Sequence, residues 1–96
     1  MYKLEFAKSF EKDFKKLAPE AQREFFDIWA VRLQENPYIG ERMKGKALKK
    51  FMKCAFRFKQ NDYRVVYWIH EKRVCVILLA IGSRENFYKR LGMRFS

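Results

Sequence analysis

Two neighbouring apolar stretches decide the fold: DYRVVYWI, residues 62–69, and VCVILLAI, residues 74–81. Both are rich in β-branched and aromatic residues, which favour strands, and residues 71–73 between them suit a tight turn. The stretch KCAFRFK, residues 53–59, precedes them across a second turn at residues 60–62. The three stretches predict an antiparallel meander. Its middle strand is apolar on both faces, so we expect cover on one side and on part of the other.

The pattern before the meander is helical. YKLEF, residues 2–6, alternates with period two and predicts a short strand. A first amphipathic helix is predicted from four apolar residues at helical spacing, Phe6, Phe10, Phe14 and Leu17. A second helix should begin near Pro19 and end before Asn36-Pro37. Its predicted core-facing residues are Phe26, Trp29, Ala30 and Leu33.

The remaining segments complete the predicted order. Residues 38–50, with two glycines and the basic run KGKALKK, read as a connector, and residues 86–91 as a short last helix. Strand, two helices, three strands and a short tail predict a single α+β domain over residues 1–96. We expect Phe6, Phe10, Phe14 and Trp29 to belong to its core, and the apolar residues outside the helical stripe to be available to a partner; these are Phe25, Ile28 and Val31.

The charge of the chain points to a polyanionic partner. Lys and Arg number 22 against 11 Asp and Glu, a formal net charge of +11 on 96 residues. Self-repulsion at this density destabilises the compact state, so the excess predicts binding to nucleic acid or to an acidic protein. A solvated basic surface without a partner is the alternative. A membrane-binding helix is disfavoured because the charges are spread along the chain.

Two cysteines, Cys54 and Cys75, are too few for a disulfide framework or a zinc site. We expect buried free thiols in a reducing cytoplasm, although a bridge stays open because both lie on predicted strands of one sheet. No apolar run reaches the roughly 18 residues of a membrane span, and no signal peptide is evident. The expected location is therefore cytoplasmic.

Several arginines stand at conspicuous positions. Arg64 interrupts an apolar strand, and Arg84 follows the last strand in GSRENFY. Arg57 alternates with phenylalanines and should point away from their face. Arg64 comes soon after a turn and should be a near cross-strand neighbour of residues 57–59. Tyr88 comes one helical turn after Arg84.

Three cations and a phenol are thus expected on one concave face. Like charges repel unless an anion lies between them, and guanidinium groups match phosphate oxygens bidentately. The pattern predicts a phosphate-binding site. The alternative is that each arginine reaches solvent or pairs with a carboxylate such as Glu5, Glu71 or Glu85.

In its order of motifs the chain resembles the RelE/ParE toxins of bacterial and archaeal toxin–antitoxin systems, over nearly its full length. The resemblance rests on YKLEFAKSFEKDFKKL (2–17), MKGKAL (43–48), DYRVVYWI and ILLAIGSRENFY (77–88). It implies a RelE-like fold, with an N-terminal strand and helical hairpin packed on an antiparallel sheet. RelE-like members are ribosome-dependent endoribonucleases that cleave mRNA, and ParE-like members inhibit DNA gyrase. We expect the RelE-like activity, with gyrase inhibition as the alternative and a basic binding module that has lost its activity as a third interpretation.

The resemblance also implies roles for single residues. In the RelE-like branch the 2′-hydroxyl of the RNA attacks the adjacent phosphate without metal or cofactor. The family's two arginines match Arg64 and Arg84 as phosphate contacts, and its C-terminal tyrosine matches Tyr88, which would stack on or orient a base. A K-x-K pair of RelE aligns with Ala55 and Arg57. Only the second position stays cationic, so the expected general base is missing.

Three residues are candidates for that base: Lys53, Lys59 and Glu85. His70 is predicted to be a surface residue, too far along its strand from Arg64 to take part. Further RNA contacts are expected from the lysines of the connector and the first strand of the meander, namely Lys46, Lys49, Lys50, Lys53 and Lys59.

The expected partners also follow from the resemblance. It implies a cognate acidic antitoxin that forms a hetero-oligomer with this chain. It also implies a ribosomal target, with contacts to mRNA and 16S rRNA. We expect the antitoxin to lay a helix or an added strand on exposed apolar surface.

Overall fold

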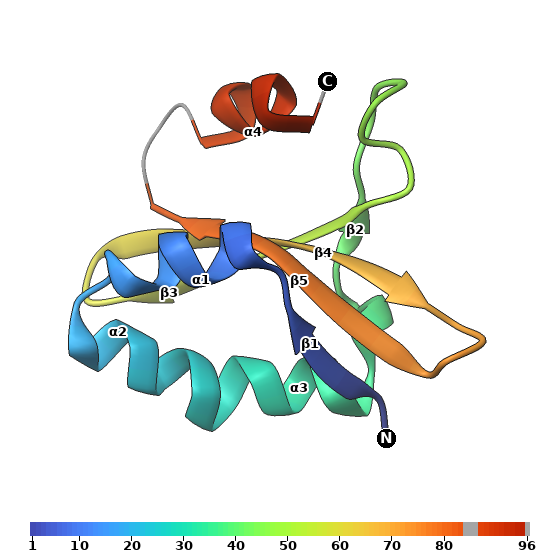
Figure 1. Cartoon of the computed structure of the whole chain (residues 1–96). Coiled ribbons are helices and arrows are strands. Elements are labelled where there is room, and N and C mark those ends of the chain that lie inside the picture. The colour runs from blue at the N-terminus through green and yellow to red at the C-terminus, as the bar shows by residue number, and fades with distance from the viewer. Residues whose placement is uncertain (84–86, 96) are drawn as a thin grey trace.

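Figure 1 shows the computed structural model of the chain, which describes residues 1–83 and 87–95. Five strands form one sheet in the order β1-β5-β4-β3-β2. The strands are β1 (Lys3–Phe6), β2 (Glu41–Arg42), β3 (Met52–Phe58), β4 (Asn61–His70) and β5 (Cys75–Gly82). The helices are α1 (Lys8–Lys15), α2 (Pro19–Glu24), α3 (Ala30–Glu35) and α4 (Phe87–Phe95). A π-helix, η1 (Phe25–Trp29), joins α2 to α3, and a 3₁₀ turn, η2 (Pro37–Ile39), follows α3.

The predicted antiparallel meander is confirmed in β3, β4 and β5. Lys59 and Gln60 form the first turn with φ of 49° and 68°, the left-handed conformation that two-residue hairpins require. Two pairings were not predicted. β1 runs parallel to β5 at one edge, and the two-residue β2 extends the opposite edge inside the predicted connector.

The second predicted helix forms over residues 19–35, but η1 changes its register. The Ala30 amide donates to the Phe25 carbonyl, five residues back, so one extra residue is inserted in the turn. As a result Phe25 is fully buried, whereas Phe26 is 46% exposed. The predicted core stripe was therefore wrong at these two positions. Ala30 and Leu33 are buried as expected, and Val31 is exposed.

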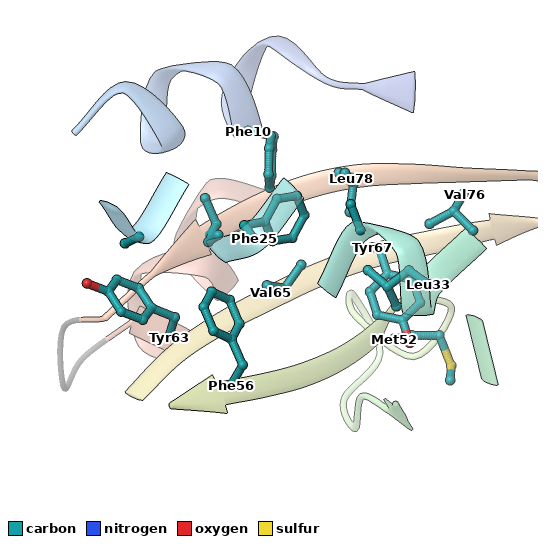
Figure 2. Packing of buried hydrophobic residues seen from close by; sticks show 13 residues of the cluster. Phe10, Phe25, Leu33, Met52, Phe56, Tyr63, Val65, Tyr67, Val76 and Leu78 are labelled. Carbon is teal, nitrogen blue, oxygen red and sulfur yellow. The ribbon is translucent and has the colours of Figure 1, made fainter. Parts of the chain in front are cut away.

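The main core lies between the helical layer of α1–α3 and one face of the sheet (Figure 2). Phe10, Phe25 and Leu33 from the helices meet Tyr67 and Leu78 from β4 and β5, all of them fully buried. Phe14 and Trp29 pack against this cluster, partly buried. Phe6 is a further correction, because it ends β1 and its side chain is 38% exposed.

A smaller core lies on the opposite face of the sheet, beneath α4 and the 43–51 segment (Figure 1). Val66 and Ala80 of the sheet are covered by Met43 and Phe51 of that segment and by Leu91 of α4. β4 is thus covered on one face and on part of the other, as its two-sided apolar sequence predicted.

α4 is anchored at both ends. At its start, Phe87 lies over Gly82, where a Cβ atom would approach the ring Cδ1 to 2.8 Å. Near its end, Arg94 donates two hydrogen bonds of 3.2 Å to the carboxylate of Asp13 on α1. Between these two anchors, Leu91 of α4 packs in the smaller core with Val66 of β4 and Ala80 of β5.

Cys54 and Cys75 are free thiols on β3 and β5, with β4 between them. Two strand spacings, about 9–10 Å, already exceed the reach of a disulfide. The cysteines are also offset along the sheet, because Cys54 pairs with Val65 and Cys75 with His70, five residues further along β4. Within residues 1–83 and 87–95, none of the helices has the length and apolar character needed to cross a bilayer.

Candidate functional site

The sheet face beneath α4 carries the predicted cations. Arg64 of β4 stands opposite Ala55 of β3 on one side and Gly82 of β5 on the other. Arg57 stands opposite Asp62, so it is displaced from Arg64 by two residues along β3. Both arginines still point to the same face, because positions 55 and 57 alternate with the buried Phe56.

The two arginines differ in their local partners. Nη1 of Arg57 lies 3.1 Å from Oδ1 of Asp62, in an ion pair whose side chains are 66% and 56% exposed. Such an exposed pair contributes little stability and leaves Arg57 able to exchange partners. Arg64 is less exposed, and its Nη1 donates to the Asp62 carbonyl at 3.4 Å. Arg64 is therefore the more enclosed of the two cations.

Tyr88 of α4 completes the described part of this face. The Lys53 ammonium lies 5.0 Å from the centroid of the Tyr88 ring, within the range of a cation–π contact. Burial raises the pKa of the Tyr88 phenol, and the positive charge of Arg64 partly opposes that shift. The phenol is neutral at physiological pH, so Tyr88 offers a hydroxyl that can donate and an aromatic face.

A cavity of about 520 Å³ opens beside Tyr88, at the outer edge of β3. β2 pairs only with Met52 and Lys53, so this edge is open from residue 54 onward in the part of the chain that the structure describes. The walls include Lys53 and Tyr88 on one side and Trp29 and Arg32 of the helical layer on the other. The guanidinium carbon of Arg32 lies 4.7 Å from the Trp29 ring centroid. The site thus includes an open strand edge between two layers.

Two further groups of this cavity were missed as site residues by the sequence reasoning. The indole Nε1 of Trp29 is buried and has no hydrogen-bond partner among the described residues, so it is a spare donor at the cavity wall. Burial raises the pKa of the neighbouring Cys54 thiol to about 12, which makes it a poor nucleophile at neutral pH. The placement of Trp29 depends on the π insertion, which leaves no clear sequence signal.

Glycines that shape the site were also missed. At Gly40, which lines the cavity, a Cβ atom would overlap the Tyr67 hydroxyl and lie 2.5 Å from the Lys53 carbonyl oxygen. The Tyr67 hydroxyl donates to the Pro37 carbonyl at 2.6 Å, which holds η2 against the sheet. Gly82 similarly leaves space for Phe87 beside Arg64. A glycine directly after a strand is a weak signal for such close approach.

Several predicted residues lie elsewhere or outside the description. Lys59 pairs with Glu20 of α2, on the helical side of the sheet, so it is not gathered with Arg64 and Tyr88. His70 ends β4 at the far hairpin, as expected. Lys46, Lys49 and Lys50 project from the 43–51 segment. Arg84 and Glu85 fall outside the described residues.

The chemistry available on this face is that of cations and a neutral phenol. Arg64 and Lys53 can bind an anionic oxygen, and Tyr88 can stack on a planar group or donate a hydrogen bond. In the described ranges, no group of three or more His, Cys, Asp or Glu residues is arranged to hold a metal ion.

The comparison with family models identifies a family for this chain. A family model described as ParE-like toxin of type II bacterial toxin-antitoxin system matches residues 4–92. No sequence among the curated proteins matches the chain.

Among solved structures, the intact RelBE toxin–antitoxin complex of E. coli has a chain 24% identical, with a TM-score of 0.72 over 88% of this chain and 99% of that one. A double mutant of E. coli RelE in the free state is 23% identical, with a TM-score of 0.74 over 99% and 98%. RelBE2 of Mycobacterium tuberculosis is 21% identical, with a TM-score of 0.73 over 86% and 91%. At these identities the likeness establishes the RelE-like fold.

Proposed function

Because this chain belongs to the ParE-like toxins of type II bacterial toxin–antitoxin systems, we propose that it is the ribosome-dependent endoribonuclease of such a system. Its target is translated mRNA. The observation that carries the proposal is the gathering of Arg64, Lys53 and Tyr88 on one face, where a phosphodiester and a neighbouring base can both be held. The net charge of +11 suits work on an RNA-rich particle.

The proposed reaction needs only the RNA and groups of the protein. The 2′-oxygen of one nucleotide attacks the adjacent phosphorus, the bond to the 5′-oxygen of the next nucleotide breaks, and a 2′,3′-cyclic phosphate forms. Negative charge builds up on the equatorial phosphate oxygens, and in this proposal Arg64 stabilises it. Arg57, and Arg84 by its match in sequence, would add positive charge that stabilises the same phosphate oxygens. Tyr88 supports the base by stacking.

Proton transfer is assigned to Lys53 in this proposal. Of the lysines considered as a base, Lys53 lies beside Tyr88, whereas Lys59 is paired with Glu20 on the other side of the sheet. A neutral lysine amine can remove the 2′-proton, and a solvent water molecule supplies the proton that the leaving 5′-oxygen takes up. Lys53→Met keeps the length of the side chain without a base, so it should abolish cleavage while preserving fold.

The alternative is gyrase inhibition without RNA cleavage. Its support is specific: Ala55 stands where RelE has the first lysine of its K-x-K pair, and the matching family model is described as ParE-like. This activity would need the fold and its surfaces, but no transition-state contacts.

Inducing the gene and mapping transcript 5′ ends separates the two activities. If the chain is a ribosome-dependent nuclease, new 5′ ends should appear within translated codons and be absent from untranslated RNA. An SOS response with intact messages would contradict the nuclease proposal. Arg64→Ala should abolish these ends, because a lost preorganised donor costs about 2–4 kcal/mol of barrier. Arg23→Ala is the matched control, since Arg23 is an exposed arginine of α2 on the helical layer. Equal cleavage by both variants would exclude Arg64 from the reaction.

We further propose an acidic antitoxin that binds apolar surface on this chain. The RelBE structures named above are toxin–antitoxin complexes. Here an aromatic groove of about 310 Å³ lies between α1 and η1, lined by Phe6, Phe14 and Phe26. Phe26 is 46% exposed although its ring packs 5.1 Å from that of Phe14. Phe26→Glu should weaken binding to the product of the neighbouring reading frame, measured by calorimetry, and leave toxicity unchanged. Unaltered affinity would place the antitoxin elsewhere.

A further inference from the structure

A second aromatic feature lies on the α4 side of the sheet, toward the far end of β4. Alternate residues of β4 face this side, namely Arg64, Val66, Trp68 and His70. Val66 is fully buried, but Trp68 and His70 are partly exposed. Their ring centroids lie 5.1 Å apart, with planes inclined at 51°. The strand therefore places a cation at one end and an aromatic pair at the other.

Lysines border this aromatic pair. Lys50 lies with its ammonium 5.8 Å from the Trp68 ring centroid and 5.6 Å from that of Phe51. Lys44, Lys46 and Lys49 of the same segment are exposed, and no carboxylate of the described residues pairs with them. The result is a pair of rings with positive charge on one side.

The segment that carries these lysines is held in place. The Met43 amide donates to the Phe51 carbonyl at 2.9 Å, and the Phe51 amide donates to the Leu48 carbonyl at 2.9 Å. Met43, Leu48 and Phe51 pack into the smaller core with Val66. The segment rises on the same side of the sheet as α4 (Figure 1). The lysines therefore project from a segment that is fixed to the sheet by hydrogen bonds and apolar packing.

We propose that Trp68 and His70 form a second base-stacking site for single-stranded RNA, separate from Tyr88, with the lysines of residues 44–50 binding the adjacent phosphates. The inference rests on the proposed function for its choice of RNA. Base stacking on aromatic side chains is tolerant of sequence, and lysines beside the rings neutralise the backbone. Trp68 lies four residues beyond Arg64 along β4, a distance of about 13 Å. One RNA strand can therefore be held at two points along β4.

This second site would do different work from the first. Stacking at Trp68 and His70 involves no reacting atom, so it increases affinity and fixes the direction of the strand across the sheet. The Lys50 side chain is long and exposed, and it can move from the Trp68 ring to a phosphate when a base takes its place.

Tryptophan fluorescence provides a direct test, because the chain has only two tryptophans, Trp29 and Trp68. Trp29→Phe leaves Trp68 as the sole reporter. The probe is a 2′-O-methyl oligouridylate, which cannot be cleaved by 2′-attack, and inorganic polyphosphate serves as an anion without bases. We expect the RNA to quench Trp68 strongly and polyphosphate to leave it nearly unchanged. An acidic peptide is tested as a third probe. Equal quenching by RNA and polyphosphate, or quenching by the acidic peptide but not by RNA, would overturn the proposal.

Affinity measurements on the otherwise unchanged chain avoid dependence on the Trp29 substitution. His70→Ala should weaken RNA binding about 5- to 30-fold, whereas His70→Phe, which keeps a ring, should retain it. Lys50→Ala should lower the slope of log affinity against log salt by about one. Lys12→Ala is its charge-matched control, because Lys12 is exposed on α1 in the helical layer, on the other side of the sheet. Unchanged binding in His70→Ala would refute the site.

Failure here and failure of the nuclease proposal are distinguishable. Quenching of Trp68 in a protein that leaves transcripts intact would retain the stacking site and reject RNA cleavage. Codon-phased cleavage by a protein whose Trp68 is not quenched would retain RNA cleavage and reject the stacking site.

Discussion

Replacing Asp13 by alanine tests how α4 is held over the candidate site. The Asp13 carboxylate accepts the Ile81 amide at 3.2 Å and both terminal nitrogens of Arg94 at 3.2 Å. The Asp13 side chain is 13% exposed and that of Arg94 is 40% exposed. Exposed ion pairs contribute about 0.2–1 kcal/mol, and hydrogen bonds to charged groups about 1.5–3 kcal/mol. For this half-exposed bidentate pair we expect about 1–2 kcal/mol toward the docking of α4.

That loss raises the population of undocked α4 about 5- to 30-fold, and its amides should exchange with deuterium faster by the same factor. Mass spectrometry of exchanged peptides measures this for residues 87–95, and peptides of α2 should be unaffected. Glu11→Ala is the matched control, because it removes a negative charge from the same helix without contacting α4. Equal exchange of α4 in wild type and Asp13→Ala would refute the reasoning, and would mean that apolar packing alone docks the helix.

Three further predictions concern the site and its support. Gly40→Ala should lower the free energy of unfolding by about 1–3 kcal/mol in urea titrations, because the new methyl overlaps the Tyr67 hydroxyl. Gly92→Ala, where a Cβ meets nothing within 4 Å, should raise stability slightly by favouring helix, and the same sign for both would contradict this account. At pH 9, Cys54 should be alkylated about 500-fold more slowly in the folded chain than in urea, because burial raises its pKa from 9.0 to about 12. Folding favours the protonated thiol, so the stability it contributes is present below pH 9 and is lost as the pH rises toward 12; rapid labelling of native Cys54 would show that the strand edge opens. Phe25→Ala should destabilise the fold by about 3–5 kcal/mol and Phe26→Ala by much less, as measured by thermal unfolding, and the opposite order would rule out the π insertion.

Local pattern alone determined most of the architecture. Period-two runs and turn residues located the meander, and helical spacing with a terminal proline located the helical hairpin, because these features depend on neighbours along the chain. The two-sided apolar character of residues 63–69 correctly indicated cover on one face of β4 and on part of the other. Alternation also placed Arg57 on the face away from Phe56.

Tertiary structure decided what depends on distant partners. The pairing of β1 with β5 joins residues about 70 positions apart, and no local signal specifies it. The π turn at Phe25 exchanged the roles of two adjacent phenylalanines, because one inserted residue rotates everything after it about the helix axis.

The candidate site shows the same division. The sequence named Arg64 and Tyr88, but the strand register set Ala55 and Gly82 beside Arg64. The docking of α4 brought Tyr88 to Lys53, and an ion pair with Glu20 drew Lys59 away. Residue type fixes which chemistry is available, whereas register and helix docking decide which groups meet, since each depends on contacts between segments far apart in the chain.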